Sequence, residues 1–234
     1  MIAVEGGSLR MGSPDGHGQA DEHPQTQVAI SAFCIDATEV NLESYDACVT
    51  NSICDAPPES IQTLEKLSAA QVEQRSALCT ARFAKNLEGK QDLPVNCVSF
   101  DEASRFCKWR GGRLPTEPEM EWLATAGEDR LQYPWGNDSP DANKLCWKKT
   151  DGPCPTRSLP PQIWGVYDVV GNLAEWTSSS YAPYAEAKAS GDSYSVRGGS
   201  WKSTEAKQIR GKQRDKRTPI LRDVEVGFRC AKNR

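Results

Sequence analysis

The chain contains 234 residues, of which 38% are hydrophobic, and carries a formal net charge of −4. A chain of this length folds as one large domain or two small ones, and it buries a sizeable core without covalent cross-links. The lack of a basic excess argues against nucleic acid as a partner, and no apolar run approaches the roughly 18 residues that span a membrane.

Regular structure is expected mainly in the first half of the chain. Short apolar stretches predict strands at 26–30, 33–35 and 94–98. Helices are expected over 42–49, 99–110 and 116–126. The second helix begins at a capping box made by Ser99 and Glu102, and the third begins at one made by Thr116 and Glu119. Glycines that follow the last two helices mark their ends.

Beyond residue 128 the chain is rich in Trp, Gly, Pro and Asn and has few periodic runs. Long irregular segments within a compact domain are usually functional, or are pinned by metals or disulfides. No low-complexity linker divides the sequence, so we expect a single domain over 1–234. Residues 55–92 are polar and nearly devoid of aromatic side chains, and we interpret this stretch as an insertion.

The nine cysteines favour disulfides over a metal site. None lies in a CxxC pair, and the chain has only two histidines, so a structural zinc site is not expected. The short separations between Cys48 and Cys54 and between Cys146 and Cys154 suggest that each pair closes a loop. Disulfides indicate an oxidising compartment. Because nine is odd, one thiol is free or pairs outside the chain.

The first seven residues are too polar for a signal peptide. We therefore expect any export signal to lie upstream of this sequence. Together with the cysteines, this predicts an extracytoplasmic protein that is secreted, periplasmic or displayed on the cell surface.

Nine phrases carry a family resemblance. They are GGSLRMGS (6–13), DEHP (21–24), FCID (33–36), PVNCVS (94–99), GRLPTEPEMEW (112–122), YPWG (133–136), GVYDVVGNLAEW (165–176), RGGSW (197–201) and GFRCA (227–231). In this order they resemble the formylglycine-generating-enzyme, or sulfatase-modifying-factor, family over residues 3–232. The resemblance implies an α+β domain with a C-type-lectin-like core, few short strands and helices, and much irregular structure. It also implies a disulfide between Cys107 and Cys230.

The resemblance implies a structural calcium ion in the segment 167–176. The matching ligands are the Asp168 and Glu175 carboxylates and the carbonyls of Gly171 and Leu173. Calcium prefers about six or more oxygen ligands, which an irregular loop can supply. The alternative is that Asp168 and Glu175 only cap or pair locally.

A second family calcium site matches this chain less well. Its four ligand positions fall on Asn143, Lys144, Asp151 and Pro153. The sequence of this loop differs from the family's and contains Cys146 and Cys154, so we expect a disulfide to stabilise the loop where the family uses a metal.

The catalytic positions of the family are changed in this chain. In the family's oxidases, two cysteines after the RGGS phrase bind copper(I) and oxidise a sulfatase cysteine to formylglycine. The matching positions here are Ser203 and Gln208. Copper(I) prefers thiolates, and a hydroxyl cannot carry out thiol–disulfide chemistry. We therefore expect no catalytic residues and no copper oxidase activity.

A sister branch of the superfamily uses non-haem iron held by three histidines. This chain has only His17 and His23, which lie together in a polar N-terminal segment. Calcium is therefore the one cofactor that we expect, and neither copper nor iron is expected.

A strongly basic segment lies where the copper site would be. Residues 202–217 contain seven basic residues against Glu205 and Asp215. One interpretation is a cationic groove that binds an acidic peptide or protein, a carboxylate- or phosphate-bearing ligand, or an anionic glycan. The other is that these charges pair with the acidic remainder of the chain. The groove would comprise Arg197, Ser200, Ser203, Lys207, Gln208, Arg210, Lys212 and Arg214.

These observations favour a non-catalytic binding or interaction module for an anionic ligand or peptide. One alternative is an oxidoreductase-like enzyme of the same superfamily that uses the same groove by an unrecognised mechanism. Another is a purely structural domain within a larger extracytoplasmic chain.

Overall fold

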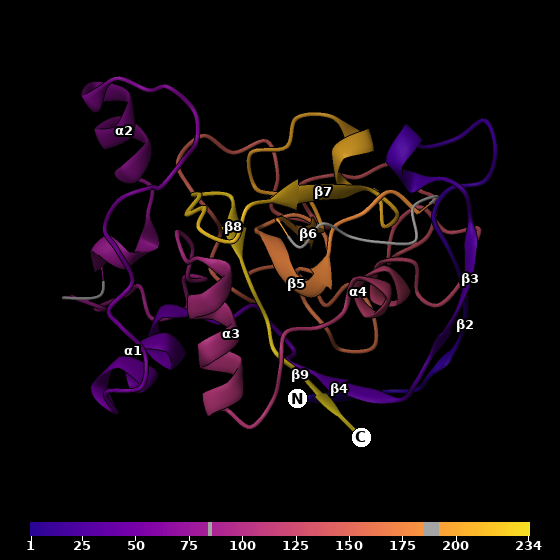
Figure 1. Ribbon diagram of the computed structural model, residues 1–234, viewed down its shortest axis with the longest axis horizontal. Coiled ribbons are helices and arrows are strands. Elements are labelled where there is room, and N and C mark those ends of the chain that lie inside the picture. Colours follow the sequence, from indigo (N-terminus) through magenta and orange to yellow (C-terminus); the bar gives the residue numbers. More distant parts are fainter. Residues whose placement is uncertain (84–85, 185–191) are drawn as a thin grey trace.

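The computed structural model describes residues 1–83, 86–184 and 192–234 (Figure 1). Its strands are β1 (Ile2–Val4), β2 (Gly7–Met11), β3 (Thr26–Ile30), β4 (Phe33–Ile35), β5 (Ala174–Ser180), β6 (Tyr194–Arg197), β7 (Arg214–Arg217), β8 (Val226–Gly227) and β9 (Ala231–Asn233). Its helices are α1 (Leu42–Thr50), α2 (Ala69–Ser76), α3 (Phe100–Trp109) and α4 (Glu117–Ala124). Short 3-10 helices are η1 (Ala20–Glu22), η2 (Thr80–Phe83) and η3 (Ala206–Ile209).

The strands form small separate sheets. β4 lies between β1 and β9 in an antiparallel sheet that holds both ends of the chain together, and β2 pairs with β3. The largest sheet has the order β7-β6-β5-β8, in which only β5 and β8 are parallel. Figure 1 shows this sheet at the centre of the molecule, with α4 beside it. The α+β architecture with short elements confirms the predicted fold class.

The predicted helices are confirmed together with their start signals. Ser99 and Glu102 form a reciprocal capping box at α3, and Thr116 and Glu119 form another at α4. The side-chain bonds satisfy backbone N–H groups that have no partner within the helix. Every residue of α4 except Pro118 is buried, including its acidic ones. This helix therefore supplies buried negative charge to the interior.

The expected strand at 94–98 is wrong. Pro94 makes a single bridge with Asn41, and no strand continues from it in the described part of the chain. Cys97 has a φ of 56°, which lies outside the β region. Val95 and Val98 are fully buried, so their apolar character reflects core packing rather than strand pairing.

The disulfides predicted from proximity, Cys48–Cys54 and Cys146–Cys154, are confirmed, as is Cys107–Cys230 from the family resemblance. Cys34 is the free thiol.

A fourth disulfide, Cys79–Cys97, was not predicted. It connects the stretch 55–92 to the core. Figure 1 shows α2 of that stretch apart from the sheets, at the upper left. Residues 84–85 lie outside the described residues, and the interpretation of 55–92 as an insertion stays a prediction. No helix among the described residues has the length and apolar character to cross a bilayer.

Candidate functional site

The loop after β6 carries the two positions where the family's oxidases have cysteines. Gly198 and Gly199 adopt φ values of 103° and 66°, which a side chain would disfavour. A Cβ at Gly199 would lie 2.5 Å from the Gln208 carbonyl oxygen, so the glycine lets the two backbone segments meet. Trp201 is fully buried, and its indole N–H donates to the Val224 carbonyl at 3.0 Å. These contacts fix the loop against the core.

The structure brings Ser200, Ser203 and Gln208 to one pocket of about 150 Å³. The Ser203 hydroxyl accepts a hydrogen bond from the Ser200 N–H at 3.0 Å, and the Ser200 hydroxyl donates to the Glu225 carboxylate at 2.5 Å. The Gln208 side-chain oxygen accepts from two backbone N–H groups at the start of η3, both at 2.9 Å. Hydroxyl and amide groups thus hold the pocket in shape, and none of its lining side chains is a soft ligand for copper(I).

The charged side chains of this pocket are mixed rather than basic. Asp215, Arg217 and Glu225 line it, and Arg217 pairs with Asp215. Outside the lining, Lys202 lies 3.5 Å from Glu225. Among the lining side chains themselves two carboxylates therefore face one guanidinium, and Lys202 compensates Glu225 from outside the lining.

The arginines of the predicted cationic groove point into the interior and pair with carboxylates there. Arg197 is 2% exposed, and its guanidinium lies 2.5 Å from Glu121 and 3.4 Å from Glu117. Arg214 is bonded to Glu117 through two nitrogens, both at 2.8 Å. Burial alone would lower the pKa of Arg197, but the negative charges of Glu121 and its neighbours hold it above the ordinary value. The acidic residues of α4 neutralise these arginines.

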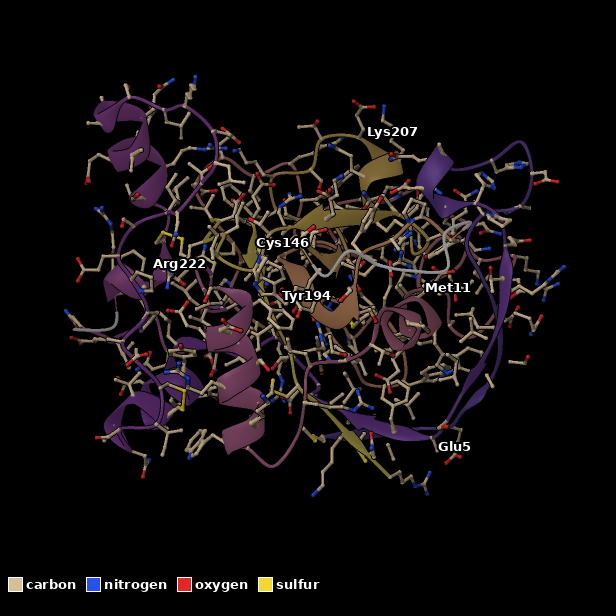
Figure 2. All side chains as sticks on the ribbon, viewed as in Figure 1. Glu5, Met11, Cys146, Tyr194, Lys207 and Arg222 are labelled. Atoms are coloured by element: carbon tan, nitrogen blue, oxygen red, sulfur yellow. A yellow bond between two sulfur atoms is a disulfide. The ribbon has the colours of Figure 1, made fainter. Side chains whose placement is uncertain are left out.

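Two of the remaining basic residues of the predicted groove, Arg210 and Lys207, are also paired with carboxylates. Arg210 makes two bonds to the buried Glu22, at 2.5 and 3.0 Å. Figure 2 shows Lys207 on η3 at the periphery, where it pairs with Glu205 at 2.8 Å. Lys212 is buried and is described below. The alternative interpretation, in which the basic segment pairs with acidic parts of the chain, is thus confirmed for the arginines.

The carboxylates of the first implied calcium site are buried and lie near a buried arginine. Glu175 accepts hydrogen bonds from two nitrogens of Arg229 at 2.7 to 3.0 Å, and both side chains are fully buried. The Asp168 carboxylate accepts a bond from the Arg157 N–H at 3.3 Å, while the Asp168 carbonyl accepts one from Arg229. Glu175 is therefore committed to a guanidinium, as the local-pairing alternative expected.

Glu39 is a third carboxylate at this place and was not singled out from the sequence. It is 1% exposed, and it accepts bonds from the Leu173 N–H at 2.8 Å and from the Asn172 amide at 2.6 Å. Burial raises the pKa of Glu39 well above its ordinary value, and the charges of Asp168 and Glu175 raise it further. Three carboxylates thus share the field of one guanidinium.

The donor set fits calcium only in part. The carbonyls of Gly171 and Leu173 accept no backbone hydrogen bond in the described part of the chain, whereas the Asp168 carboxylate already accepts one from the Arg157 N–H. However, no group of three or more His, Cys, Asp or Glu side chains within residues 1–83, 86–184 and 192–234 is arranged to hold a metal ion. A calcium ion here would depend mainly on backbone oxygens and Asp168.

The second implied calcium set is less suitable. Asp151 is exposed and lies 4.0 Å from Lys149, and the Lys144 carbonyl accepts a bond from the Gln162 amide at 3.2 Å. Asn143 is exposed, and Pro153 lies within the loop closed by the Cys146–Cys154 disulfide. The disulfide provides the covalent closure that was expected in place of a metal.

The fold and the site together define a domain built like the formylglycine-generating enzymes, with hydroxyl and amide groups where their thiols would be. The family model described as "Sulfatase-modifying factor enzyme 1-like domain" matches residues 1–234, so the chain belongs to this family. The chain is 29% identical to the inactive C-alpha-formylglycine-generating enzyme 2 of Mus musculus, over 99% of this chain and 85% of that protein. It is 28% identical to the formylglycine-generating enzyme of Bos taurus, over 99% of this chain and 74% of that one.

The fold is also that of a solved relative. PvdO from Pseudomonas aeruginosa superposes with a TM-score of 0.74 at 22% identity, covering 99% of this chain and 93% of that chain. This likeness concerns the fold alone. The chain is about equally identical to a relative named inactive and to one named simply formylglycine-generating enzyme. Overall identity therefore does not distinguish the two, and the residues at the pocket must decide the chemistry.

Proposed function

We propose that this domain is a non-catalytic binding module that holds a polypeptide segment at the pocket of Ser203 and Gln208. The observation that carries the proposal is the retained pocket, whose frame is intact while both thiol positions hold groups that cannot be oxidised as thiols. The likeness to a relative named as inactive supports the same interpretation.

The pocket suits a neutral or basic side chain of the bound segment. A cavity of about 150 Å³ accommodates a group of roughly benzene size, which corresponds to one side chain. Its lining carries two carboxylates, Asp215 and Glu225, and one guanidinium, Arg217, while Lys202 pairs with Glu225 from outside; we therefore expect an acidic side chain inside the pocket to be disfavoured. This replaces the anionic ligand expected from the basic segment, since the arginines of that segment are paired with buried carboxylates.

The four disulfides are consistent with an extracytoplasmic module, because such bonds persist in oxidising compartments. We therefore place the expected partner outside the cytoplasm as well.

A peptide array tests the proposal directly. Peptides would be synthesised in matched sets that carry Lys, Gln or Glu at one central position, and binding would be measured by fluorescence anisotropy. We expect the Lys and Gln peptides to bind at least tenfold more tightly than the Glu peptides, and the preference for Lys over Gln to weaken in Glu225→Gln. Glu128→Gln, an exposed charge outside the pocket, serves as the matched control. Equal binding of all three peptides would remove the support for this pocket.

A second measurement tests the absence of catalysis. The protein would be incubated with copper(I) and a cysteine-containing sulfatase peptide, and the peptide would be analysed by mass spectrometry and aldehyde capture. We expect the thiol to survive. Formation of an aldehyde would overturn the proposal and favour an enzyme of unrecognised mechanism.

We also propose that the segment 168–175 takes up a structural calcium ion. The excess of carboxylates around Arg229 supports this, because a cation there would offset uncompensated negative charge. Added calcium is expected to raise the melting temperature relative to protein treated with a chelator, and Asp168→Asn should abolish that response. An identical melting temperature with calcium and with chelator would count against the ion.

A further inference from the structure

A second cavity lies away from the pocket described above. It has a volume of about 290 Å³ and opens between the N-terminal loop, the turn after α4 and the segment that follows η3. Figure 1 shows the first and last of these segments beside each other at the upper right, and the Arg210–Glu22 ion pair joins them. Leu131 and Pro14 give its wall an apolar part, and Lys212 gives it an amine.

Lys212 differs from the other buried basic side chains of this protein. It is 6% exposed, and its ammonium donates to the Asp129 carbonyl oxygen at 2.6 Å. Arg197, Arg214 and Arg229 each have a carboxylate partner, whereas no carboxylate in the described residues forms an ion pair with Lys212. An ammonium has three N–H donors, so two are left for a ligand.

The carboxylates around the cavity are already committed to other cations. Asp129 is bonded by Arg10 at 2.7 Å, and Glu22 is bonded by Arg210 and by the Ser13 hydroxyl. The uncompensated positive charge at the cavity therefore belongs to Lys212. A buried charge without a counter-charge is unfavourable, which makes an entering anion favourable. Burial lowers the pKa of the Lys212 amine, while the charges of Glu121, Asp129 and Glu22 act in the opposite direction.

We propose that this cavity binds the carboxylate group of a small, singly charged organic anion, which pairs with the Lys212 ammonium. The single negative charge of a carboxylate matches the single excess positive charge of Lys212, whereas a doubly charged phosphate would bring one negative charge that has no cationic partner. The volume suits a compact ligand near the lower end of the usual range for small-molecule sites. The apolar wall favours an organic body over a bare inorganic ion. This inference goes beyond the proposed peptide module, because the place and the ligand are different.

Two sources could supply such a carboxylate: a free organic acid or an acidic sugar residue. The probes are acetate, lactate and glucuronate, each compared with its uncharged amide, together with inorganic phosphate. Binding would be followed by calorimetry and by backbone amide shifts in NMR spectra. We expect at least one carboxylate to bind at least tenfold more tightly than its amide, with shifts at residues 129–132. Binding of lactate but not of glucuronate would indicate a free organic acid as the ligand. Binding of glucuronate but not of lactate would indicate an acidic sugar.

The variant Lys212→Met keeps the length of the side chain and removes its charge. We expect it to lower the affinity for the best carboxylate at least tenfold, whereas Lys207→Met, an exposed lysine outside the cavity, should leave it unchanged. Circular dichroism would establish that both variants are folded, and if Lys212→Met does not fold, the comparison of acid with amide on the unaltered protein decides. Equal binding of acid and amide, tighter binding of phosphate, or shifts confined to other regions would overturn the proposal.

Discussion

Replacing Glu117 with glutamine tests whether the basic segment is held by buried ion pairs. The substitution keeps the shape of the side chain and removes its charge. Glu117 is the carboxylate partner of Arg214, with two nitrogen–oxygen distances of 2.8 Å, and both side chains are at most 5% exposed. Removing one partner of a buried pair costs about 3–5 kcal/mol because the other charge remains buried.

The structure places the expected cost near the lower end of that range. Arg214 would keep bonds to the Asp21 and Ala182 carbonyls at 3.0 and 2.8 Å, and its guanidinium would still lie over the rings of Tyr181 and Tyr184. We therefore expect Glu117→Gln to reduce the free energy of unfolding by about 3 kcal/mol. For a domain of this size this corresponds to a fall in melting temperature of about 6–12 °C.

Urea denaturation of the oxidised protein at neutral pH measures this effect. Glu128→Gln is the matched control, because its partner Arg130 is 84% exposed and the pair should contribute less than about 1 kcal/mol. Adding Arg214→Met to Glu117→Gln should cost less than the sum of the two single changes, since the pair is already broken. A loss of less than 1 kcal/mol for Glu117→Gln would mean that Arg214 reaches solvent, and the cationic groove would have to be considered again.

Three further predictions concern pH, cross-linking and copper. Burial alone would raise the pKa of Glu22, but its arginine partner holds the pKa below the ordinary 4.5. The stability that this lowered pKa contributes is present above pH 4.5 and is lost as the pH falls through the folded-state pKa. In urea titrations Glu22→Gln, which has no carboxyl group here to titrate, should therefore lose less stability than the wild type between about pH 5 and pH 3. Replacing Cys107 and Cys230 by serine opens a loop with a sequence separation of 123 and should lower the free energy of unfolding by about 5 kcal/mol. The double variant Ser203→Cys/Gln208→Cys should bind copper(I) in a chelator competition in which the unaltered protein does not.

Each of these has a clear contrary outcome. If the wild type and Glu22→Gln lost the same stability between about pH 5 and pH 3, Glu22 would have its ordinary pKa in the folded protein. Unchanged stability of the double serine variant would mean that the unfolded chain is not restrained by this disulfide. Failure of the double cysteine variant to bind copper(I) would mean that the two positions are not oriented toward a common point.

The family motifs were sufficient to predict the fold class, and local capping boxes predicted α3 and α4; α2, which begins at a similar box made by Ser68 and Gln71, was not predicted. The disulfides also divide into those that local sequence marks and those that it does not. Cys48–Cys54 was predictable from six residues of separation, but Cys79–Cys97 was not, because neither spacing nor a motif marks it. Its partners meet only after the stretch 55–92 has folded against the core.

The sequence left two interpretations of the basic segment open, because charge counts carry no information about burial. The acidic residues that neutralise it lie almost a hundred positions earlier, on α4, where Glu117 and Glu121 occur within a helix that is buried on nearly every side. A helix that combines Trp122 with several acidic residues was the available signal. Glu39 was missed for a related reason, since only tertiary folding brings it to Asp168 and Glu175.

The sheet that contains both ends of the chain has a mechanical consequence. β1 and β9 flank β4 and run in the same direction, so a force that separates the two termini pulls the outer strands in opposite directions along their axes. Such loading shears all of the backbone hydrogen bonds of a strand together instead of opening them one after another. Cys230 directly precedes β9 and is tied to Cys107 on α3, so the disulfide would limit extension from the C-terminal side to the last few residues. Any further extension under tension would have to come from the chain between β1 and Cys107.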